Sequence, residues 1–372
     1  MSYDSIDKLQ LALANTTFKN RKDSKKAAGR ALGTFVEIIT YYFLKLIGLQ
    51  HNICIEYKIP EYANMNITHN VEFTLHGSEL VYEYKYNLEK LPIKANKIFN
   101  DNKNILKINN VNLIDKNNII YNAKRLCYDD KFIYNAYVNT DEQFIKIYKL
   151  VNRPFAMFEC KRVGVEAGNK KGPQTIEKAK QGAYVSRVVS SFQKIRNYDG
   201  TLLGVLSNNN SGFSLFNYYD KLDEIISTSK LELLKDFILT IGIVSNHGNW
   251  FISDNPNKEL KILSQSYDYL LFLTDNGITQ FIETLLLSNK KEYDDIKYAF
   301  KESYSPSIKN VNIFTKSKIY LKADIALNKY FYNYFENIKK WFNVISPKGL
   351  DLDSIIVNIK KLLEKDWKEV YK

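Results

Sequence analysis

The segment from residue 155 to residue 196 constrains the fold more than any other part of the chain. It begins with four consecutive apolar residues that run directly into Glu159, Cys160 and Lys161. A short apolar run rich in aromatic residues is typical of a buried strand. Successive side chains of a strand point to opposite faces, so Glu159 and Lys161 share one face while Cys160 points to the other. An acid and an amine therefore stand together at the end of a hydrophobic strand.

This charged pair is costly to bury unless something binds beside it. Burial of an isolated carboxylate or ammonium is strongly unfavourable, and each group only partly neutralises the other. A divalent cation on Glu159, with a phosphate oxygen or an attacking water on Lys161, would complete the arrangement. The alternative is a surface strand that carries a Glu–Lys pair without chemical function.

A Gly- and Lys-rich loop over residues 163–172 separates this strand from a predicted helix. Gly172 suits the cap, and Pro173 suits the first helical position, where its missing N–H costs nothing. Residues at helical spacing are expected to face the sheet: Ile176, Ala179, Ala183, Val188, Phe192 and Ile195. The opposite face is polar and basic, which suits a polyanion: Lys178, Lys180, Gln181, Tyr184 and Arg187. The apolar run at residues 201–206 is predicted to form the next strand.

This strand–loop–helix–strand unit, with Glu-x-Lys at the end of its first strand, resembles the PD-(D/E)XK nuclease superfamily and, within it, the type II restriction endonucleases. The resemblance implies an α/β fold, a restriction-endonuclease-like core whose mixed central sheet is flanked by helices, with α+β insertions and a helical C-terminal region. It implies a Mg²⁺-dependent, sequence-specific endonuclease that cleaves double-stranded DNA with metal-activated water. Glu159 would bind the metal and Lys161 would orient the water. A cognate DNA methyltransferase is expected in the same system.

The resemblance also calls for a second acid on an earlier strand, and several residues are candidates. No Pro-Asp pair marks it. Asp141 stands at a spacing that the family tolerates, and Glu72 is its equal rival if residues 87–140 are an insertion between core strands. Asp130 is a third candidate. Each would bind the metal together with Glu159.

Further candidates are weaker. A second Glu-x-Lys, at residues 83–85, ranks behind the first because the segment after it carries Pro92 and is a poor packing helix. The helix predicted over residues 24–48 carries Glu37 among apolar residues, where it either faces solvent or, by resemblance, reaches toward the metal site. Gln181 and Tyr184 support the site by resemblance or are simply exposed. His247 is expected to lie in a loop, because the paired ligands of a His-metal nuclease are missing around it.

The remaining strands and the domains follow from alternation and composition. A strand is predicted at residues 51–59, a hairpin at residues 71–75 and 80–86, and a second hairpin from residues 143–150 back into the Glu-x-Lys strand. The predicted nuclease core covers residues 1–230, with an insertion near residues 87–140. Residues 231–372 are predicted to form an α/β to helical region that serves DNA recognition or dimerisation. A two-fold homodimer is the arrangement that many such enzymes use.

Composition agrees with an anionic partner. The 372 residues carry a net charge of +12, although an AT-rich genome would also enrich lysine. Three widely spaced cysteines form no CxxC pair, which disfavours structural zinc and disulfides and fits a cytoplasmic location. We expect no signal peptide and no membrane span, since no uninterrupted apolar stretch reaches about 18 residues. The alternatives are a repair or mobile-element nuclease of the same superfamily and a non-catalytic basic nucleic-acid-binding protein.

Overall fold

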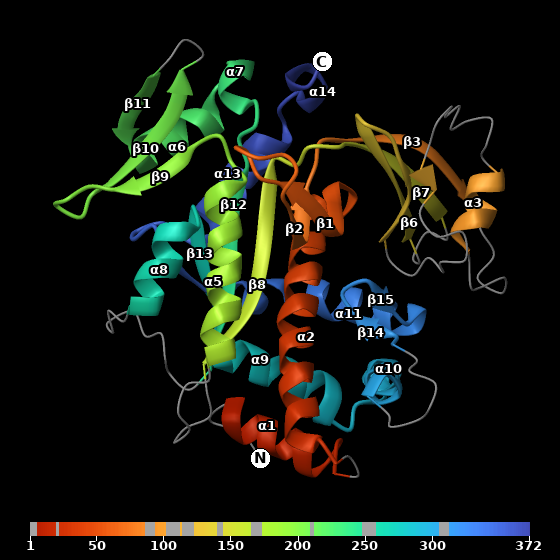
Figure 1. The fold of residues 1–372 in the computed structure, drawn as a ribbon. Helices are drawn as coiled ribbons and strands as arrows, with labels where there is room; N and C mark the ends of the chain where they lie inside the picture. The colour runs from red at the N-terminus through yellow and green to blue at the C-terminus, as the bar shows by residue number, and fades with distance from the viewer. Residues whose placement is uncertain are drawn as a thin grey trace. The chain divides into compact units, whose positions relative to one another are not determined.

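The computed structural model describes residues 6–19, 22–85, 94–101, 112–113, 123–139, 144–164, 173–208, 212–247, 258–304 and 312–372. The fold is mixed α/β, with a mixed central sheet flanked by helices (Figure 1). The chain divides into two compact units. Unit 1 contains Met1–Ile55, Ser78–Asn152 and Ile278–Ile338, and unit 2 contains Glu56–Gly77, Arg153–Gly277 and Lys339–Lys372.

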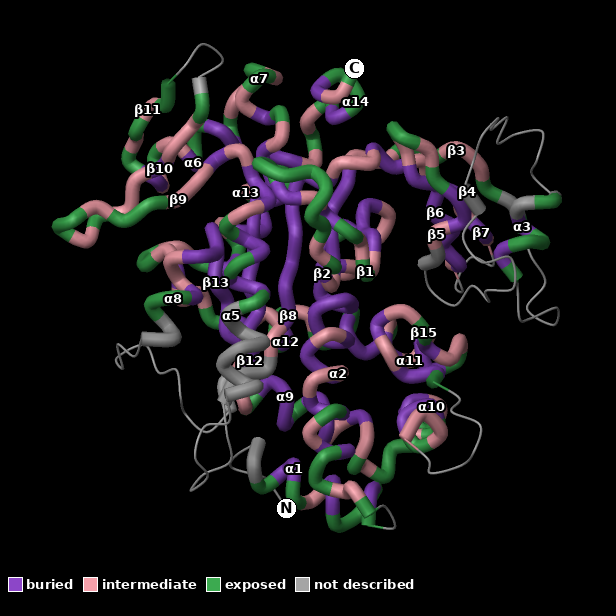
Figure 2. Tube along the Cα trace, viewed as in Figure 1, coloured by how far each residue is buried: buried purple, intermediate pink, exposed green. Residues whose placement is uncertain are grey.

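The central sheet follows the order β1-β2-β8-β12-β13-β16 through the described residues. Its strands are β1 (Ile53–Pro60), β2 (Thr68–Leu75), β8 (Ala156–Gly164), β12 (Leu239–His247), β13 (Tyr269–Leu273) and β16 (Phe342–Ser346). The Glu-x-Lys strand is β8, as predicted, and it is buried along most of its length (Figure 2). It pairs antiparallel with β2 and parallel with β12. The parallel pair requires a crossover connection, and this connection includes α5 (Pro173–Val188). The helix α5 begins at the predicted proline.

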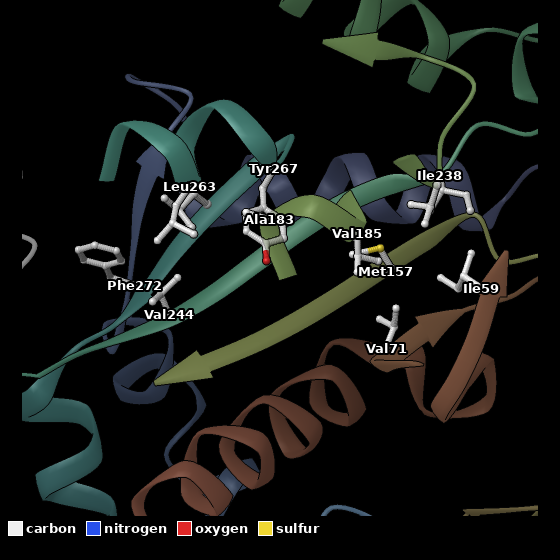
Figure 3. Close-up of a cluster of buried hydrophobic side chains, with 12 residues drawn as sticks. Ile59, Val71, Met157, Ala183, Val185, Ile238, Val244, Leu263, Tyr267 and Phe272 are labelled. Atoms are coloured by element: carbon white, nitrogen blue, oxygen red, sulfur yellow. The ribbon is translucent and has the colours of Figure 1, made fainter. Parts of the chain in front are cut away.

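One layer of unit 2 packs on the central sheet through α5 and α8 (Lys258–Ser266). Figure 3 shows the buried cluster between these helices and the strands, which includes Met157, Ala183, Val185, Val244, Leu263 and Tyr267. The described part of unit 2 also contains four further helices, namely α6 (Tyr218–Ser227), α7 (Leu231–Leu234), α13 (Leu352–Leu363) and α14 (Trp367–Val370). Burial of this apolar layer stabilises the position of β8.

A small antiparallel sheet interrupts the crossover. Its order is β11-β10-β9, formed by β9 (Gln193–Arg196), β10 (Leu202–Asn208) and β11 (Gly212–Asn217). The strand predicted at residues 201–206 therefore exists, but the next strand of the central sheet is β12. Ile195, predicted to face the sheet from the helix, instead lies in β9 and is exposed, because α5 ends at Val188.

Unit 1 begins with helices. These are α1 (Ile6–Asn15) and α2 (Ser24–Leu44), followed by the π-helical η1 (Lys45–Leu49) and the 3₁₀ turn η2 (Gln50–Asn52). The helix predicted over residues 24–48 is thus confirmed. Later helices that lie wholly or mostly in the unit are α9 (Asp275–Ile282), η4 (Glu283–Leu287), η5 (Lys291–Tyr293), α10 (Asp294–Tyr304), α11 (Leu321–Asn333) and α12 (Phe335–Lys339), with a short hairpin formed by β14 (Phe314–Thr315) and β15 (Lys318–Ile319).

The segment Ser78–Asn152 forms its own antiparallel sheet in the order β3-β7-β6-β5-β4. The strands are β3 (Ser78–Lys85), β4 (Asn112–Leu113), β5 (Ala123–Tyr128), β6 (Phe132–Asn139) and β7 (Phe144–Val151), with α3 (Ala95–Asp101) beside them. Both predicted hairpins are therefore wrong, since β2 does not pair with β3, nor β7 with β8. The reason is burial: β7 alternates between buried and partly exposed positions and suits a one-sided sheet, whereas β8 is buried on both faces.

Residues 24–52 also form a helix long and apolar enough to cross a membrane by length and composition. Of its most apolar window, 67% is buried inside the protein. The core helix of a soluble protein has the same character, so this helix is weak evidence for a membrane span.

Candidate active site

Two carboxylates meet where β2 and β8 lie side by side in unit 2. The antiparallel pairing places Phe73 opposite Phe158, so one position further Glu72 stands level with Glu159. Like charges at such neighbouring positions repel each other. The fold therefore brings together two acids that are far apart in the sequence, and a cation is needed between them.

Lys161 supplies one cation. Its Nζ lies 2.5 Å from Glu159 Oε1 and 3.0 Å from Glu72 Oε1. The backbone N–H of Cys160 also donates to Glu72 Oε2, at 3.3 Å. We call Glu72, Glu159 and Lys161 the Glu–Glu–Lys cluster. Two carboxylates share a single ammonium, so one negative charge of the cluster is left uncompensated when both are ionised.

The cluster has an unsatisfied oxygen. Glu159 is only 5% exposed, and its Oε2 is buried without a hydrogen-bond partner among the described residues. A buried carboxylate oxygen that accepts no hydrogen bond is costly, and a bound ion often satisfies such a group. Mg²⁺ is commonly held by one or two carboxylates, with water and phosphate oxygens completing its shell. Glu72 and Glu159 fit that donor set. The described residues contain no group of three or more His, Cys, Asp or Glu placed to hold a metal.

The protonation of the cluster follows from burial and from the neighbouring charges. Burial raises the pKa of Glu159 well above its ordinary value, and the Glu72 carboxylate raises it further against the opposing effect of Lys161. Burial alone would lower the pKa of Lys161, but the two carboxylates outweigh it and hold that pKa above its ordinary value. Lys161 therefore stays cationic at neutral pH, while the charge on Glu159 is held at a cost in stability.

Two glycines and a tyrosine shape the space beside Glu159. A Cβ on Gly182 of α5 would lie 2.8 Å from Glu159 Cγ and 2.7 Å from the hydroxyl of Tyr267. Gly242 of β12 stands opposite Glu159, and a Cβ there would lie 2.6 Å from the ring of Tyr267. Burial, followed by the charge of Glu159, raises the pKa of Tyr267 well above its ordinary value, so its hydroxyl stays neutral. Sequence reasoning missed these three residues, although a glycine inside a helix and one inside a buried strand indicate a close approach.

Gly182→Ala is expected to destabilise the protein by about 1–3 kcal/mol, the typical cost of overpacking. The added methyl group must displace Glu159 or Tyr267, so any activity that depends on the Glu–Glu–Lys cluster should fall as well. Thermal unfolding measures the first effect, and an assay of that activity on the same preparation measures the second. The matched control is Gly33→Ala in α2, where a Cβ meets nothing within 4 Å. That variant should be neutral or gain up to about 1 kcal/mol from helix propensity, and an equal loss in both variants would contradict the packing argument.

The structure places the other candidates elsewhere. Asp141 lies outside the described residues. Asp130 is exposed between β5 and β6 of unit 1. Glu37 forms an ion pair with Lys316 at 3.3 Å within the same unit. His247 is the last residue of β12 rather than a loop residue.

The second Glu-x-Lys lies in β3 of unit 1. Glu83 forms a long ion pair of 3.9 Å with Lys146, and Lys85 lies 5.7 Å from the centre of the Phe144 ring. The side chain of Glu83 is 47% exposed. Glu83 and Lys85 are therefore exposed charged residues of a surface strand.

On α5, Gln181 is exposed. The Tyr184 hydroxyl donates to Glu61 Oε1 at 3.2 Å, and Glu61 also pairs with His69 at 2.7 Å. Tyr184 therefore ties α5 to the loop between β1 and β2. The side chains of Lys178 and Lys180 lie outside those that the structure describes.

A scan against protein-family models found no family that matches this chain. Searches of curated proteins and of solved structures also found no match.

Proposed function

We propose that this protein is a Mg²⁺-dependent, sequence-specific endonuclease that cleaves double-stranded DNA, a type II restriction enzyme of the PD-(D/E)XK superfamily. One observation carries the proposal: two carboxylates share one lysine, and one of their buried oxygens has no hydrogen-bond partner among the described residues. A structural ion pair would be expected to satisfy its oxygens. An oxygen left without a donor suits a cation.

The order of elements supports a restriction-endonuclease-like core. The Glu-x-Lys strand β8 lies between β2, which carries the second acid, and the parallel strand β12, which is reached through α5. The segment between β2 and β8 forms a sheet of its own, which agrees with an insertion between core strands. Glu72 is then the second acid, and Asp141 and Asp130 are not needed.

The roles of the residues follow from their chemistry. Glu72 and Glu159 would hold Mg²⁺ through their carboxylate oxygens. When bound, this ion would lower the pKa of a water and stabilise charge that builds on the phosphate. Lys161 contacts the carboxylate oxygens that the metal ion would also need. With the ion in place, Lys161 would therefore release one carboxylate, and its ammonium would face the attacking water or a phosphate oxygen. Tyr267 would limit the access of solvent to Glu159.

The partners in this proposal are double-stranded DNA, to which the net charge of +12 is suited, and a cognate DNA methyltransferase that protects the host sequence. A cytoplasmic enzyme acting as a homodimer fits that role, since two-fold proteins match palindromic sites.

The proposal is tested by incubating the purified protein with plasmid DNA and Mg²⁺, with an EDTA control. Discrete fragments that require Mg²⁺, followed by run-off sequencing of their ends, would establish the site and the cut position. Preference for damaged or branched DNA would favour a repair or mobile-element nuclease. Absence of any cleavage, with DNA binding retained, would favour a non-catalytic binding protein.

The identity of the second acid is tested separately. Glu72→Gln is expected to lower Mg²⁺-dependent cleavage by about 100-fold or more, because it removes one carboxylate from the cation and one charge from the cluster. Asp141→Asn should leave cleavage within about twofold of the unchanged protein. Initial cleavage rates at saturating Mg²⁺ measure both. The reverse pattern would assign the metal site to Asp141 instead.

A further inference from the structure

We propose that a cavity in unit 1 binds a nucleotide, with its base among tyrosines and its phosphate on lysines. The cavity has a volume of about 490 Å³ and is formed by α2 with η1, by β6 and β7, and by α11. Its volume lies in the usual range for small-molecule sites, about 300–1,000 Å³. The proposal does not involve the Glu–Glu–Lys cluster.

Regular spacing brings the lining residues together. Tyr42 and Lys45 are three residues apart on one helical turn, and Tyr137 and Asn139 alternate onto one face of β6. Lys146 stands opposite Tyr137 in β7 and therefore shares that face. On α11, the lining side chains follow helical spacing: Ile325, Asn328, Lys329 and Tyr332.

The lining is aromatic and cationic. Tyr41, Tyr137 and Phe331 are buried within it, while Tyr332 is 76% exposed and free to fold over a ligand. The cationic side chains of the lining are Lys45, Lys146 and Lys329, and none of the described lining residues is acidic. Acids behind the lining pair with two of these lysines, Asp324 with Lys45 at 3.2 Å and Glu83 with Lys146 at 3.9 Å, so Lys329 is the main phosphate contact. Aromatic rings stack on nucleobases, and ammonium groups bind phosphates. An anionic aromatic ligand matches both properties.

A buried carboxylate orders this wall. Asp324 of α11, which is 2% exposed, accepts hydrogen bonds from the Tyr42 hydroxyl at 2.5 Å, from Lys45 Nζ at 3.2 Å and from Asn328 Nδ2 at 3.1 Å. The bond to Asn328 Nδ2 orients that amide, so its oxygen is the acceptor available to a base edge. A site whose side chains are already ordered loses less entropy when a ligand binds.

Two sources of a nucleotide share this chemistry. One is a free nucleoside monophosphate, which would make the cavity an effector site. The other is a nucleotide unit of a DNA strand, turned out of the stack into the cavity. The second source rests on the proposed nuclease function, whereas the first does not.

The test is calorimetric titration of the full-length protein without Mg²⁺, so that cleavage plays no part. The probes are the four deoxynucleoside 5′-monophosphates, inorganic phosphate, and a short single-stranded oligonucleotide. Tyr332→Ala should weaken nucleotide binding about tenfold through lost stacking. Lys329→Gln should weaken it about three- to tenfold and flatten its salt dependence. Both residues are exposed, so neither change threatens folding.

Matched controls come from the same chain. Lys322→Gln removes another exposed lysine of α11, and Tyr198→Ala removes a tyrosine that is 98% exposed, and neither residue lines the cavity. An effector site would be supported if the monophosphates bind, if the two cavity variants weaken this binding, and if the two control variants leave it unchanged. Binding of the oligonucleotide alone, with the same pattern, would support a nucleotide unit of DNA. Three results would overturn the proposal. They are the absence of any binding, an affinity for inorganic phosphate equal to that for nucleotides, and equal effects in the cavity and control variants. Failed cleavage with intact nucleotide binding would affect only the nuclease proposal.

Discussion

Lys161→Ala is expected to lower Mg²⁺-dependent DNA cleavage by about 1,000-fold while DNA binding is retained. The change removes the ammonium that orients water and offsets charge on the phosphate, and loss of one such group typically costs a factor of about 100–1,000. It also removes the only cation seen between Glu72 and Glu159 among the described residues. The metal-free protein should therefore be less stable. Because Lys161 no longer competes for the carboxylate oxygens, Mg²⁺ should raise the melting temperature more than in the unchanged protein.

The control for this change is Lys221→Gln. Lys221 is another largely buried lysine of unit 2, with its side chain 11% exposed and paired with Glu224 at 2.9 Å. That variant should cleave normally. Cleavage by purified Lys161→Ala at a normal rate would exclude the Glu–Glu–Lys cluster as the catalytic centre, as would a Mg²⁺-induced rise in melting temperature no larger than that of the unchanged protein.

Glu159→Gln is expected to abolish cleavage and yet stabilise the metal-free protein. Glutamine keeps the shape of the side chain but removes a buried charge that faces Glu72. Relief of such strain at functional sites is typically worth about 1 kcal/mol, or roughly 1–2 °C in melting temperature for a chain of 372 residues. Mg²⁺ at ten times its Kd would stabilise the unchanged protein by roughly 1.4 kcal/mol. The variant should lack this gain.

The stability difference between the two proteins should depend on pH. The pKa of Glu159 is higher in the folded than in the unfolded protein, so the folded state binds the proton more tightly. The contribution of Glu159 to the free energy of unfolding is therefore most favourable below the pKa of the unfolded state, about 4.3. This contribution is lost as the pH rises through the pKa of the folded state. The advantage of Glu159→Gln should grow over the same interval and then level off.

Unfolding measured from acid to neutral pH, with Glu224→Gln as the control for an exposed glutamate, tests this prediction. Throughout this interval Lys161 stays protonated, because its pKa is raised. If Glu159→Gln is less stable than the unchanged protein at neutral pH, Glu159 stabilises the metal-free fold. It would then be a structural residue, and the unsatisfied oxygen would no longer point to a cation.

Local patterns in the sequence were enough to place several elements. The apolar run before Glu159 predicted β8, Pro173 marked the first residue of α5, and helical spacing predicted α2. Alternation along β8 also put Glu159 and Lys161 on one face. Each of these features depends on residues that are neighbours in the chain, so side-chain periodicity and cap chemistry carry the information.

The partner of β8 was decided only by the tertiary structure. Sequence order favoured β7, the preceding strand, but the segment Ser78–Asn152 folds into a sheet of its own and leaves β2 beside β8. This pairing selects Glu72 as the acid that meets Glu159, and the crossing of α5 at Gly182 sets the room around it. Strand pairing and helix packing are set by burial summed over distant segments, which no local period records.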